Sequence, residues 1–544
     1  MDFKKQLLMT LSKQIKETNT LEVPPNQTFG DFALPCFKLS KKPEELQKSL
    51  KLPNFIEKTE VKGPYLNFFI KKEYLAEQVI KKILKEKEKY GSQNLGRNKT
   101  ITIDMSSPNV AKPFGIGHLR STIIGNSIAK ICEKLGYKII KINYLGDWGT
   151  QFGKLITGYK HFGSEKELQK EPIKYLLDIY VKVNQDPSLE EESRQWFKKL
   201  EEGNKEALQL WKRFKDLSLK EFNKIYKILN VTFDVISGES LYNAKMEAIV
   251  KELKQKGLLK ESEGALVVNL EEYNLGVCII QKSDGTSLYA TRDIALAIDR
   301  YKTYKPVKMI YEVGSEQKLH FKQFFKVLEL MGNNWAKECV HVDHGLYLDK
   351  DGKKFATRKG KTVFMIDILN ETIELAKQTI KEKNPNLKNK DEVARKVAIG
   401  AIFYGDLKNT RTRDITFNIE KFLDFEGDTG PYIQYTCARA SSILKKAGKF
   451  KQTVKGINDK EKELIKELGK FPEAVVNANK QLSPHLIANY TFQLSQKFNE
   501  FYHACPVLTE KEPIRSSRLA IVQATKYTLA SALSLLGIEA PEKM

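Results

Sequence analysis

Hydrophobic and polar residues alternate in the segment TITIDMSS, which begins at Thr100 and ends in small polar residues. This alternation predicts a β-strand that runs into a loop. After a stretch with Gly and Pro, apolar residues recur every three or four positions and predict a helix ended by Gly136: Leu119, Ile123, Ile124, Ile128 and Ile131. A second strand pattern, KIIKINYL, follows. The order strand, helix, strand is typical of the nucleotide-binding half of an open parallel sheet, whose ligand lies at the strand's carboxyl end.

The remaining pattern divides the chain into three regions. Residues 1–95 mix helical and strand patterns and end near the Gly- and Asn-rich stretch GSQNLGRNK, which indicates a linker. Residues 96–415 hold the strand–helix–strand unit, charged helices near 165–260 that indicate an insertion, and further strand patterns such as KMIYEVG. Residues 416–544 are almost wholly helical, with apolar stripes at helical spacing. We therefore predict a multidomain α/β protein: an α+β domain, a parallel-sheet domain with a helical insertion, and an α-helical bundle.

Composition narrows the class of protein without fixing its function. A chain of 544 residues with 41% hydrophobic and 29% charged residues is typical of a soluble protein with several domains. Its apolar runs are far shorter than the roughly 20 residues that cross a bilayer, and its N-terminus has the pattern of a helix rather than of a signal, so we expect a cytoplasmic protein. Lys and Arg outnumber Asp and Glu by 91 to 68, which favours a nucleic-acid partner but also fits Lys-rich solvated faces. The six Cys residues have no paired spacing, so we expect reduced, mostly buried thiols.

The loop between the first strand and its helix carries the most specific chemistry. Gly115 and Gly117, in the sequence GIGH, would let the backbone approach a phosphate at the helix N-terminus, where free N–H groups favour anions. His118 could donate to a phosphoryl oxygen, and Lys112 and Arg120 would add positive charge. The four residues alone are a weak signal, because a tight turn with an internally bonded His gives the same pattern.

The residues around GIGH strengthen this signal. The stretch from Ser106, SSPNVAKPFGIGHLRSTIIGNSIAKICEKLGYKIIKINYLGDWGTQFGKL, resembles the signature region of arginyl-tRNA synthetases, class I enzymes with a Rossmann-type catalytic domain. Further similar segments occur along the chain in the order of that family: GDFA, GPYLNFF, SLYATRDIALAIDRY, VGSEQKLHFKQFF, KFATRKGKTV, DLKNTRTRDITFN, FEGDTGPYIQYTCARA, YHACPVL and LLGIEAPEKM. The resemblance therefore spans nearly the whole chain.

The resemblance implies a reaction in two steps. The carboxylate of arginine attacks the α-phosphate of ATP, which Mg²⁺ accompanies, and gives arginyl-adenylate and pyrophosphate. The arginyl group then passes to the 2′-hydroxyl of the terminal adenosine of arginine tRNA. Catalysis of this kind needs positioning and electrostatic stabilisation rather than an acid or base on the protein. Family behaviour also implies that tRNA binds before arginine is activated. We expect no metal held by the protein itself, and a monomer is the family's default state.

Both motifs of class I synthetases are altered in this sequence. The HIGH motif corresponds to Gly115, Ile116, Gly117 and His118, so its first His is absent. The KMSKS loop resembles a stretch in which Thr replaces the second Lys: Lys354, Phe355, Ala356, Thr357 and Arg358. The resemblance assigns the first motif and residues 354–357 to ATP binding, and Gly115, Gly117, His118, Lys354 and Arg358 to catalysis. It also implies that Lys112, just ahead of the first motif, supplies the charge of the missing Lys.

The resemblance also assigns residues to the amino acid. A guanidinium group needs planar acceptors, ideally a carboxylate. By motif position, Asp293 and Tyr289 face the guanidinium, Asn109 and Asp104 hold the α-amino end, and Gln317 lines the same pocket. Asp104 stands where the family often has Glu, so its reach is shorter. Local rules alone would make Asp293 only an acid near a helix N-terminus.

The C-terminal domain of the family binds the anticodon, and its N-terminal domain contacts the elbow of the tRNA. From the C-terminal region we select Tyr432, Gln434, Arg439 and Met544 as tRNA contacts, because aromatic and polar groups bind splayed bases. Two other functions fit parts of the pattern. One is an RNA-binding regulatory paralogue that has lost catalysis, and the other is a class I synthetase or nucleotidyltransferase for a different substrate.

Two histidines are interpreted as structural. His341 and His344 lie three positions apart on a predicted strand, so their rings face opposite sides and do not form a metal site. The aromatic run FKQFFKV is likewise expected to pack a helix rather than to stack on bases.

Overall fold

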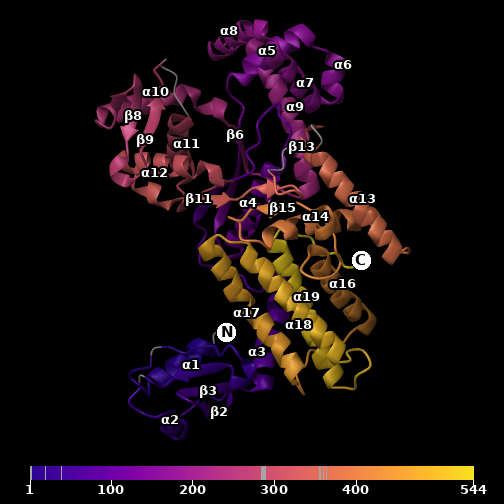
Figure 1. The fold of residues 1–544 in the computed structure, drawn as a ribbon. Helices are drawn as coiled ribbons and strands as arrows, with labels where there is room; N and C mark the ends of the chain where they lie inside the picture. Colours follow the sequence, from indigo (N-terminus) through magenta and orange to yellow (C-terminus); the bar gives the residue numbers. More distant parts are fainter. Residues whose placement is uncertain are drawn as a thin grey trace.

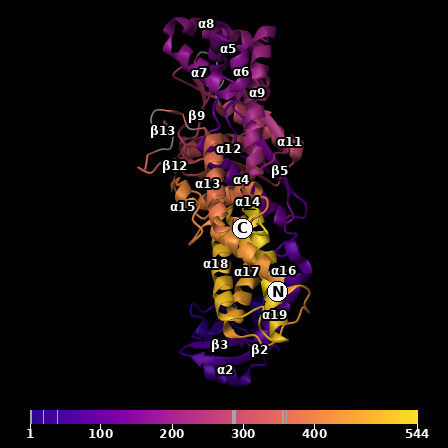
Figure 2. The same ribbon diagram turned by 90° about the vertical axis from the view of Figure 1, so that its right-hand side faces the viewer.

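The structure is a computed structural model that describes residues 3–18, 20–37, 39–283, 289–353, 357–358, 361–362 and 364–544. The side chains of residues 27, 357, 358, 361 and 362 are outside this description. The molecule is elongated, with the N-terminal domain at one end, a helical insertion at the other, and the catalytic sheet and C-terminal helices between them (Figure 1, Figure 2).

A five-stranded parallel sheet forms the centre of the molecule. Its strands, in spatial order, are β11 (Cys339–His344), β10 (Lys308–Gly314), β4 (Thr100–Asp104), β5 (Lys138–Leu145) and β6 (Val235–Gly238). The chain moves outward from β4 to β6 on one side and resumes at β10 on the other, so the direction of winding reverses between β4 and β10. Ligands bind at the carboxyl ends of the strands at such a reversal.

Helix α4 (Ile116–Lys134) connects β4 to β5 and confirms the predicted strand–helix–strand unit. It is buried over most of its surface because the sheet covers one side and C-terminal helices α17 and α19 cover another. Gly125 allows the close approach to the sheet, since a Cβ atom there would lie 2.5 Å from the Cβ of Met105. The N-terminus of α4 is thereby fixed at the point where the winding reverses.

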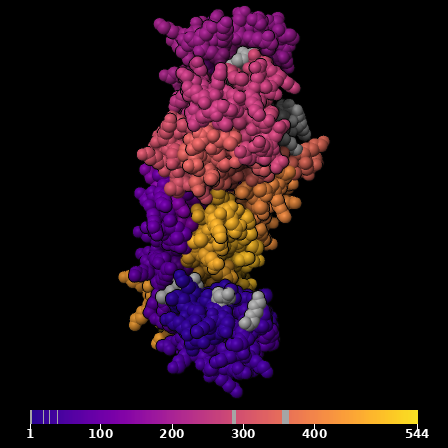
Figure 3. All heavy atoms as spheres, turned by 90° about the vertical axis from the view of Figure 1, so that its left-hand side faces the viewer, coloured from indigo at the N-terminus to yellow at the C-terminus, as the bar shows by residue number. Residues whose placement is uncertain are grey.

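Two insertions interrupt the sheet. The first consists of α5 (Gln151–Phe162), α6 (Glu165–Lys170), α7 (Pro172–Gln185), α8 (Glu190–Glu201) and α9 (Lys205–Leu229). The second contains α10 (Asn243–Gln255), an antiparallel sheet of β7 (Lys260–Ser262), β8 (Ala265–Asn269) and β9 (Val277–Gln281), and α11 (Tyr289–Tyr304). The expected single helical insertion near 165–260 is therefore wrong in its bounds, because β6 within that range pairs parallel with β5. The second insertion forms a lobe beside the sheet (Figure 1), and in the space-filling view its surface lies between the first insertion and the C-terminal helices (Figure 3).

The N-terminal domain packs α1 (Phe3–Ser12) and α2 (Pro43–Ser49) against an antiparallel sheet of β1 (Phe32–Pro35), β3 (Tyr65–Ile70) and β2 (Ile56–Lys62). Helix α3 (Lys72–Glu86) leads from it to the catalytic domain. Buried Asp31 joins this domain to α17, because it accepts the Ile70 amide hydrogen and forms ion pairs with Lys462, 3.1 Å away, and with Lys466.

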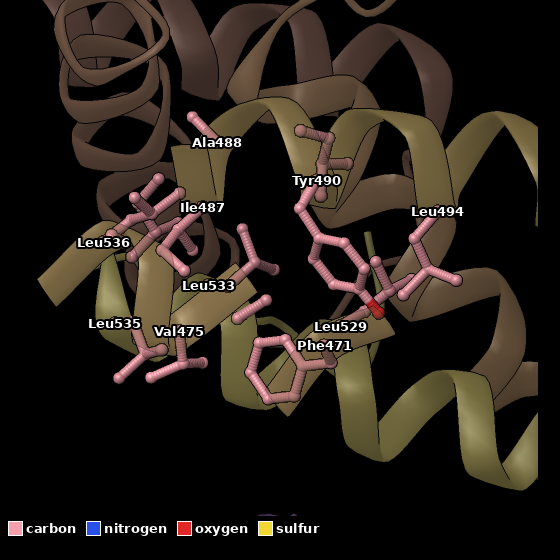
Figure 4. Packing of buried hydrophobic residues seen from close by; sticks show 14 of the residues in the cluster. Phe471, Val475, Ile487, Ala488, Tyr490, Leu494, Leu529, Leu533, Leu535 and Leu536 are labelled. Atoms are coloured by element: carbon pink, nitrogen blue, oxygen red, sulfur yellow. The ribbon is translucent and has the colours of Figure 1, made fainter. Parts of the chain in front are cut away.

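After α12 (Lys318–Leu330) and β11, short strands β12 (Tyr347–Leu348) and β15 (Ile415–Thr416) pair in parallel. The remaining helices are α13 (Met365–Lys383), α14 (Lys390–Leu407), α15 (Ile419–Phe422), α16 (Gly430–Ala447), α17 (Asp459–Gln481), α18 (His485–Ala504) and α19 (Ile514–Leu535). Apolar side chains of α17, α18 and α19, such as Phe471, Leu494 and Leu529, interdigitate in the bundle core (Figure 4). The predicted helical bundle is confirmed.

Two further features of the fold concern the cysteines and the apolar helices. All six cysteines are buried and none forms a disulfide bond. Among the helices that the structure describes, none combines the length and apolarity that a membrane span requires.

Candidate active site

A cavity of about 330 Å³ lies at the carboxyl ends of β4, β10 and β11, at the reversal of winding. Its wall is formed by the ends of these strands, the first turns of α4 and the segment that follows β11: Ser106, Ser107, Gly115, Ile116, Gly117, His118, Arg120, Ser121, Glu312, Val313, Gly314, Glu316, Gln317, His344, Gly345, Leu346 and Tyr347. The GIGH turn therefore lies in the cavity wall, where its free N–H groups can meet a bound anion.

Gly115 caps α4 together with His118. The Gly115 N–H donates to His118 Nδ1 at 3.0 Å, and the His118 N–H donates to the Gly115 carbonyl at 3.0 Å. Burial lowers the pKa of His118 to about 4, so the ring is neutral at pH 7. Because Nδ1 accepts a hydrogen bond, the ring hydrogen is on Nε2, which can act as a donor. No described atom lies within 4 Å of a Cβ built on Gly117, so this side of the turn is open.

Lys112 lies outside the cavity wall. Its side chain is exposed, and its Nζ lies 6.0 Å from the ring centroid of Tyr180 in the first insertion. The turn that carries it is anchored from the same insertion, because the Ala111 N–H donates to Ser218 Oγ at 3.0 Å. The structure thus places Lys112 between the GIGH turn and the insertion, without a carboxylate partner among the described residues.

Arg120 corrects one expectation, because its charge is not available to a phosphate. Its side chain is only 1% exposed. It donates to the carbonyls of Leu346, Arg411 and Arg413 and lies 3.3 Å from a carboxylate oxygen of Asp406. The position two residues after His118 faces the protein interior, so this guanidinium is a structural group.

The residues expected at the guanidinium of arginine come from α11. Asp293 is partly buried, and its Oδ2 lies 2.7 Å from Nε2 of His320. Tyr289 is 66% exposed at the first turn of α11, directly after residues 284–288, which are outside the described structure. Gln317 lies in the wall of the cavity. The structure therefore brings Asp293 into contact with α12, and Gln317 lies in the turn that precedes this helix.

The two residues expected at the α-amino group differ in burial and in their protein partners. Asp104, at the end of β4, is buried and binds Arg300 Nη1 at 2.7 Å, so its carboxylate is already compensated by a group of the protein. Burial raises the pKa of Asp104, and the Arg300 charge opposes that shift. Asn109 is exposed, and its backbone forms an isolated parallel bridge with Gly146 after β5. Only Asn109 is open to a ligand in this structure.

Glu239 is a candidate that the sequence analysis missed. It follows β6 directly and lies 3.5 Å from Arg292. Burial raises its pKa to about 7; the charge of Arg292 opposes the shift, and the charges of Asp147 and Asp293 add to it. The charges of Asp293, Glu239 and Arg292 also act on Tyr144, whose hydroxyl is buried and has no hydrogen-bond partner among the described residues. Recognition of β6 as a sheet strand would have placed Glu239 at the ligand edge.

The second motif lies largely outside the described structure. Lys354, Phe355 and Ala356 lie outside the described residues. For Thr357 and Arg358 the backbone is described as β13 (Thr357–Arg358), which pairs antiparallel with β14 (Lys361–Thr362). The predicted roles of these five residues stay predictions.

A second cavity, of about 640 Å³, lies between α13, α16 and α18. Its wall includes three of the residues selected as tRNA contacts, Tyr432, Arg439 and Met544, together with Tyr435 and Phe425. The fourth selection, Gln434, is wrong as a surface contact. It is fully buried, and its amide donates to the carbonyls of Lys396 at 2.9 Å and Glu539 at 2.8 Å.

The two histidines of β11 have protein partners. His341 stacks on Phe321, with ring centroids 4.3 Å apart, and its Nε2 lies 3.0 Å from the carbonyl of Val313. His344 pairs with Glu312 at 2.8 Å. Among the residues that the structure describes, no group of three or more His, Cys, Asp or Glu side chains could hold a metal ion.

Comparisons with known proteins agree with this fold. Residues 79–419 match the family model described as tRNA synthetases class I (R), catalytic domain; residues 433–544 match the DALR anticodon binding domain; and residues 2–70 match the arginyl tRNA synthetase N terminal domain. The fold and the site together define a class I aminoacyl-tRNA synthetase.

Full-length relatives narrow this class. The chain is 47% identical to an arginine–tRNA ligase of Alkaliphilus metalliredigens over 565 aligned residues, with 100% of both chains covered. It is 48% identical to that of Clostridium acetobutylicum, again with 100% of both covered. Among solved structures, arginyl-tRNA synthetase from Thermus thermophilus matches with a TM-score of 0.84 at 27% identity over 100% of both chains. The chain belongs to the arginyl-tRNA synthetases, the arginine–tRNA ligases.

Proposed function

We propose that the cavity at the GIGH turn binds ATP and that the acidic residues Asp293 and Glu239, which together we call the arginine pocket, bind arginine, so that the carboxylate of arginine meets the α-phosphate between them. The observation that carries this proposal is the free N-terminus of α4, with a neutral His118, at the reversal between β4 and β10. The product is arginyl-adenylate, and the arginyl group then moves to the terminal adenosine of the tRNA.

The nucleotide is held mainly by backbone and by neutral donors. The N–H groups at Ile116 and Gly117 and Nε2 of His118 donate to phosphate oxygens. Mg²⁺ enters as part of the substrate, bound to the triphosphate of ATP. Lys112 is exposed and lacks a carboxylate partner among the described residues, so it can swing towards the developing charge on pyrophosphate. The expected contributions of residues 354–358 complete this part of the proposal.

Arginine is held by carboxylates and by residues of three segments. Asp293 and Glu239 bind the guanidinium, because the two negative charges repel each other and a bound cation reduces this repulsion. Tyr289 closes the pocket from the start of α11, and Gln317 and Asn109 bind the α-amino end. Asp104 acts indirectly, since it holds the buried guanidinium of Arg300 beneath this pocket.

The tRNA is bound by the C-terminal helices and by the N-terminal domain. The second cavity offers the exposed ring of Tyr435 and the guanidinium of Arg439, which lies 4.9 Å from the centroid of that ring, and this combination suits unstacked bases. Tyr432 and Met544 complete its wall. The N-terminal domain contacts the elbow. The monomeric state and the cytoplasmic location also belong to this proposal, and light scattering during gel filtration tests the first.

Aminoacylation of arginine tRNA with labelled arginine tests the function, with ATP–pyrophosphate exchange measured with and without tRNA. We expect charging with arginine and exchange only when tRNA is present. Exchange without tRNA would refute the expected order of binding. A folded protein that binds tRNA but charges none would support the regulatory paralogue, and charging with another amino acid would support the third alternative.

For the arginine pocket, Asp293→Asn should lower kcat/KM for arginine by about a hundredfold or more, because it removes a charge-assisted contact to the guanidinium. Asp299→Asn is a matched control on the same helix, since Asp299 pairs with Lys245 at 2.8 Å away from the pocket. Equal losses in the two variants would exclude a specific role for Asp293.

A further inference from the structure

Among the described residues that line the cavity at the GIGH turn, Arg120 is the most deeply buried basic residue. It lies in the first turns of α4, just after His118, and its side chain is 1% exposed. Nη1 donates to the Leu346 carbonyl at 3.2 Å, and Nη2 donates to the carbonyls of Arg411 at 3.1 Å and Arg413 at 2.8 Å. A charge of this kind is kept in the interior only when its partners compensate for the loss of water.

Asp406 at the end of α14 compensates the charge. Its side chain is 2% exposed, its Oδ2 lies 3.3 Å from Arg120 Nε, and it also accepts a hydrogen bond from the Tyr347 hydroxyl. The Arg120 guanidinium lies 5.4 Å from the ring centroid of Tyr347. Arg120, Asp406 and Tyr347 therefore form one buried unit that joins α4, α14 and the segment after β11.

This unit holds a wall of the cavity in place. Gly345, Leu346 and Tyr347 line the same cavity as the GIGH turn. The Gly345 N–H donates to the same Arg411 carbonyl that Arg120 binds, at 3.0 Å, and the Leu346 N–H donates to Asp414 at 2.7 Å. The segment 345–347 and the loop 411–414 thus share hydrogen bonds, and Arg120 ties both to the helix that carries His118.

We propose that Arg120 and Asp406 are positioning residues for ATP: they set the distance between the GIGH turn and the wall formed by Gly345, Leu346 and Tyr347. The inference rests on the proposed function, in which this cavity takes the nucleotide. Neither side chain touches the substrate. A Lys at position 120 would keep the charge but could not bind three carbonyls and a carboxylate at once, since it lacks the planar fork of donors.

The test uses the full chain with Arg120→Lys and Asp406→Asn, and measures ATP–pyrophosphate exchange in the presence of tRNA. We expect kcat/KM for ATP to fall about ten- to a hundredfold, the loss that a displacement of roughly 1 Å produces. The KM for arginine should change less than about twofold, because the arginine pocket lies on other segments. Equilibrium binding of a non-hydrolysable ATP analogue should weaken in parallel, which separates binding from turnover.

Arg395→Lys is the matched control. Arg395 lies on α14 like Asp406 and binds Glu539 at 2.6 Å and the Ile228 carbonyl at 3.3 Å, and neither Arg395 nor these partners line the cavity. It should cost thermal stability while leaving both KM values near those of the wild type. If Arg120→Lys is folded by circular dichroism and weakens ATP and arginine equally, or changes only stability, the proposal is overturned.

Tyr347→Phe decides the question if the charge variants do not fold. It removes only the hydroxyl that binds Asp406, and the ring stays in the wall. We expect the KM for ATP to rise a few-fold with the KM for arginine unchanged, and an unchanged KM for ATP would overturn the proposal. A wild-type protein that charges no tRNA would instead overturn the proposed function, so the two failures are distinguishable.

Discussion

Asp31 joins the N-terminal domain to α17, and its removal should open that joint. The carboxylate is 4% exposed, and the side chains of its partners Lys462 and Lys466 are 12% and 19% exposed. Asp31→Asn keeps the shape of the side chain and can still accept the Ile70 amide hydrogen, so the substitution isolates the loss of charge. Two mostly buried ammonium groups would then lack a contacting carboxylate among the described residues, and the charge of exposed Asp459 would act on them only from a greater distance.

The cost follows from burial. Removing one partner of a buried ion pair costs about 3–5 kcal/mol, whereas an exposed pair contributes about 0.2–1 kcal/mol. Because both lysines keep some access to water along their flexible stems, we expect a cost of about 2 kcal/mol for opening the joint. Since 1.4 kcal/mol corresponds to a factor of ten, the Ile70 amide should exchange hydrogen about thirtyfold faster in the variant.

Hydrogen exchange followed by mass spectrometry measures this change locally, which matters because a multidomain chain does not unfold in a single transition. Lys72→Met is the matched control at the same joint, since Lys72 pairs at 2.7 Å with Asp459, which is 85% exposed. We expect less than about threefold faster exchange there. Equal changes in the two variants, or no change in Asp31→Asn, would refute the reasoning that buried charge holds the domains together.

Three further predictions concern single residues. Lys112→Ala should lower arginine activation about a hundredfold in pyrophosphate exchange, whereas Lys182→Ala, at an exposed Lys on α7 of the first insertion, should not. Activation by Lys112→Ala near the wild-type rate would remove the proposed compensation. Because burial lowers the pKa of His118 to about 4, its neutral ring stabilises the fold above its unfolded pKa, and this stability is lost as the pH falls towards 4. Urea unfolding of His118→Asn should therefore show a smaller loss over that range than the wild type, and identical curves would contradict the lowered pKa. Gln434→Leu should lower the melting temperature by several degrees, since two buried carbonyls lose their donor, yet leave the KM for tRNA unchanged; a raised KM would restore Gln434 as a tRNA contact.

Local patterns predicted the elements that hold the site. The alternation from Thr100 and the apolar spacing from Leu119 predicted β4, α4 and β5 nearly to their ends. These predictions succeeded because strand and helix periodicity reflects burial along a short segment. The predicted bounds of the insertion were wrong because local periodicity does not reveal a very short strand. Strand β6 is only four residues long, and nothing local distinguishes it from the loops around it.

The sequence did not show which hydrogen-bond and ion-pair partners the polar side chains have. Arg120 and Gln434 are polar residues in segments that resemble those of arginyl-tRNA synthetases, so the sequence indicated that both contact a ligand. In the structure they bind backbone carbonyls of segments more than a hundred positions away or of a different helix. Asp104 likewise meets Arg300, 196 positions along the chain. Such pairings depend on how helices and strands pack, which composition and spacing do not encode locally.

The sequence by itself determined the chemistry that is present: the GIGH turn with one His, the carboxylates, the excess of positive charge and the helical C-terminal region. Only the tertiary structure decided which of these groups stay free. A polar side chain in the interior must find a partner, and long-range packing supplies that partner to Arg120, Asp104 and Gln434. The same packing leaves the N-terminus of α4 open beside a neutral His118. Polar groups that have a partner within the protein hold the fold, and polar groups that lack one can bind a substrate.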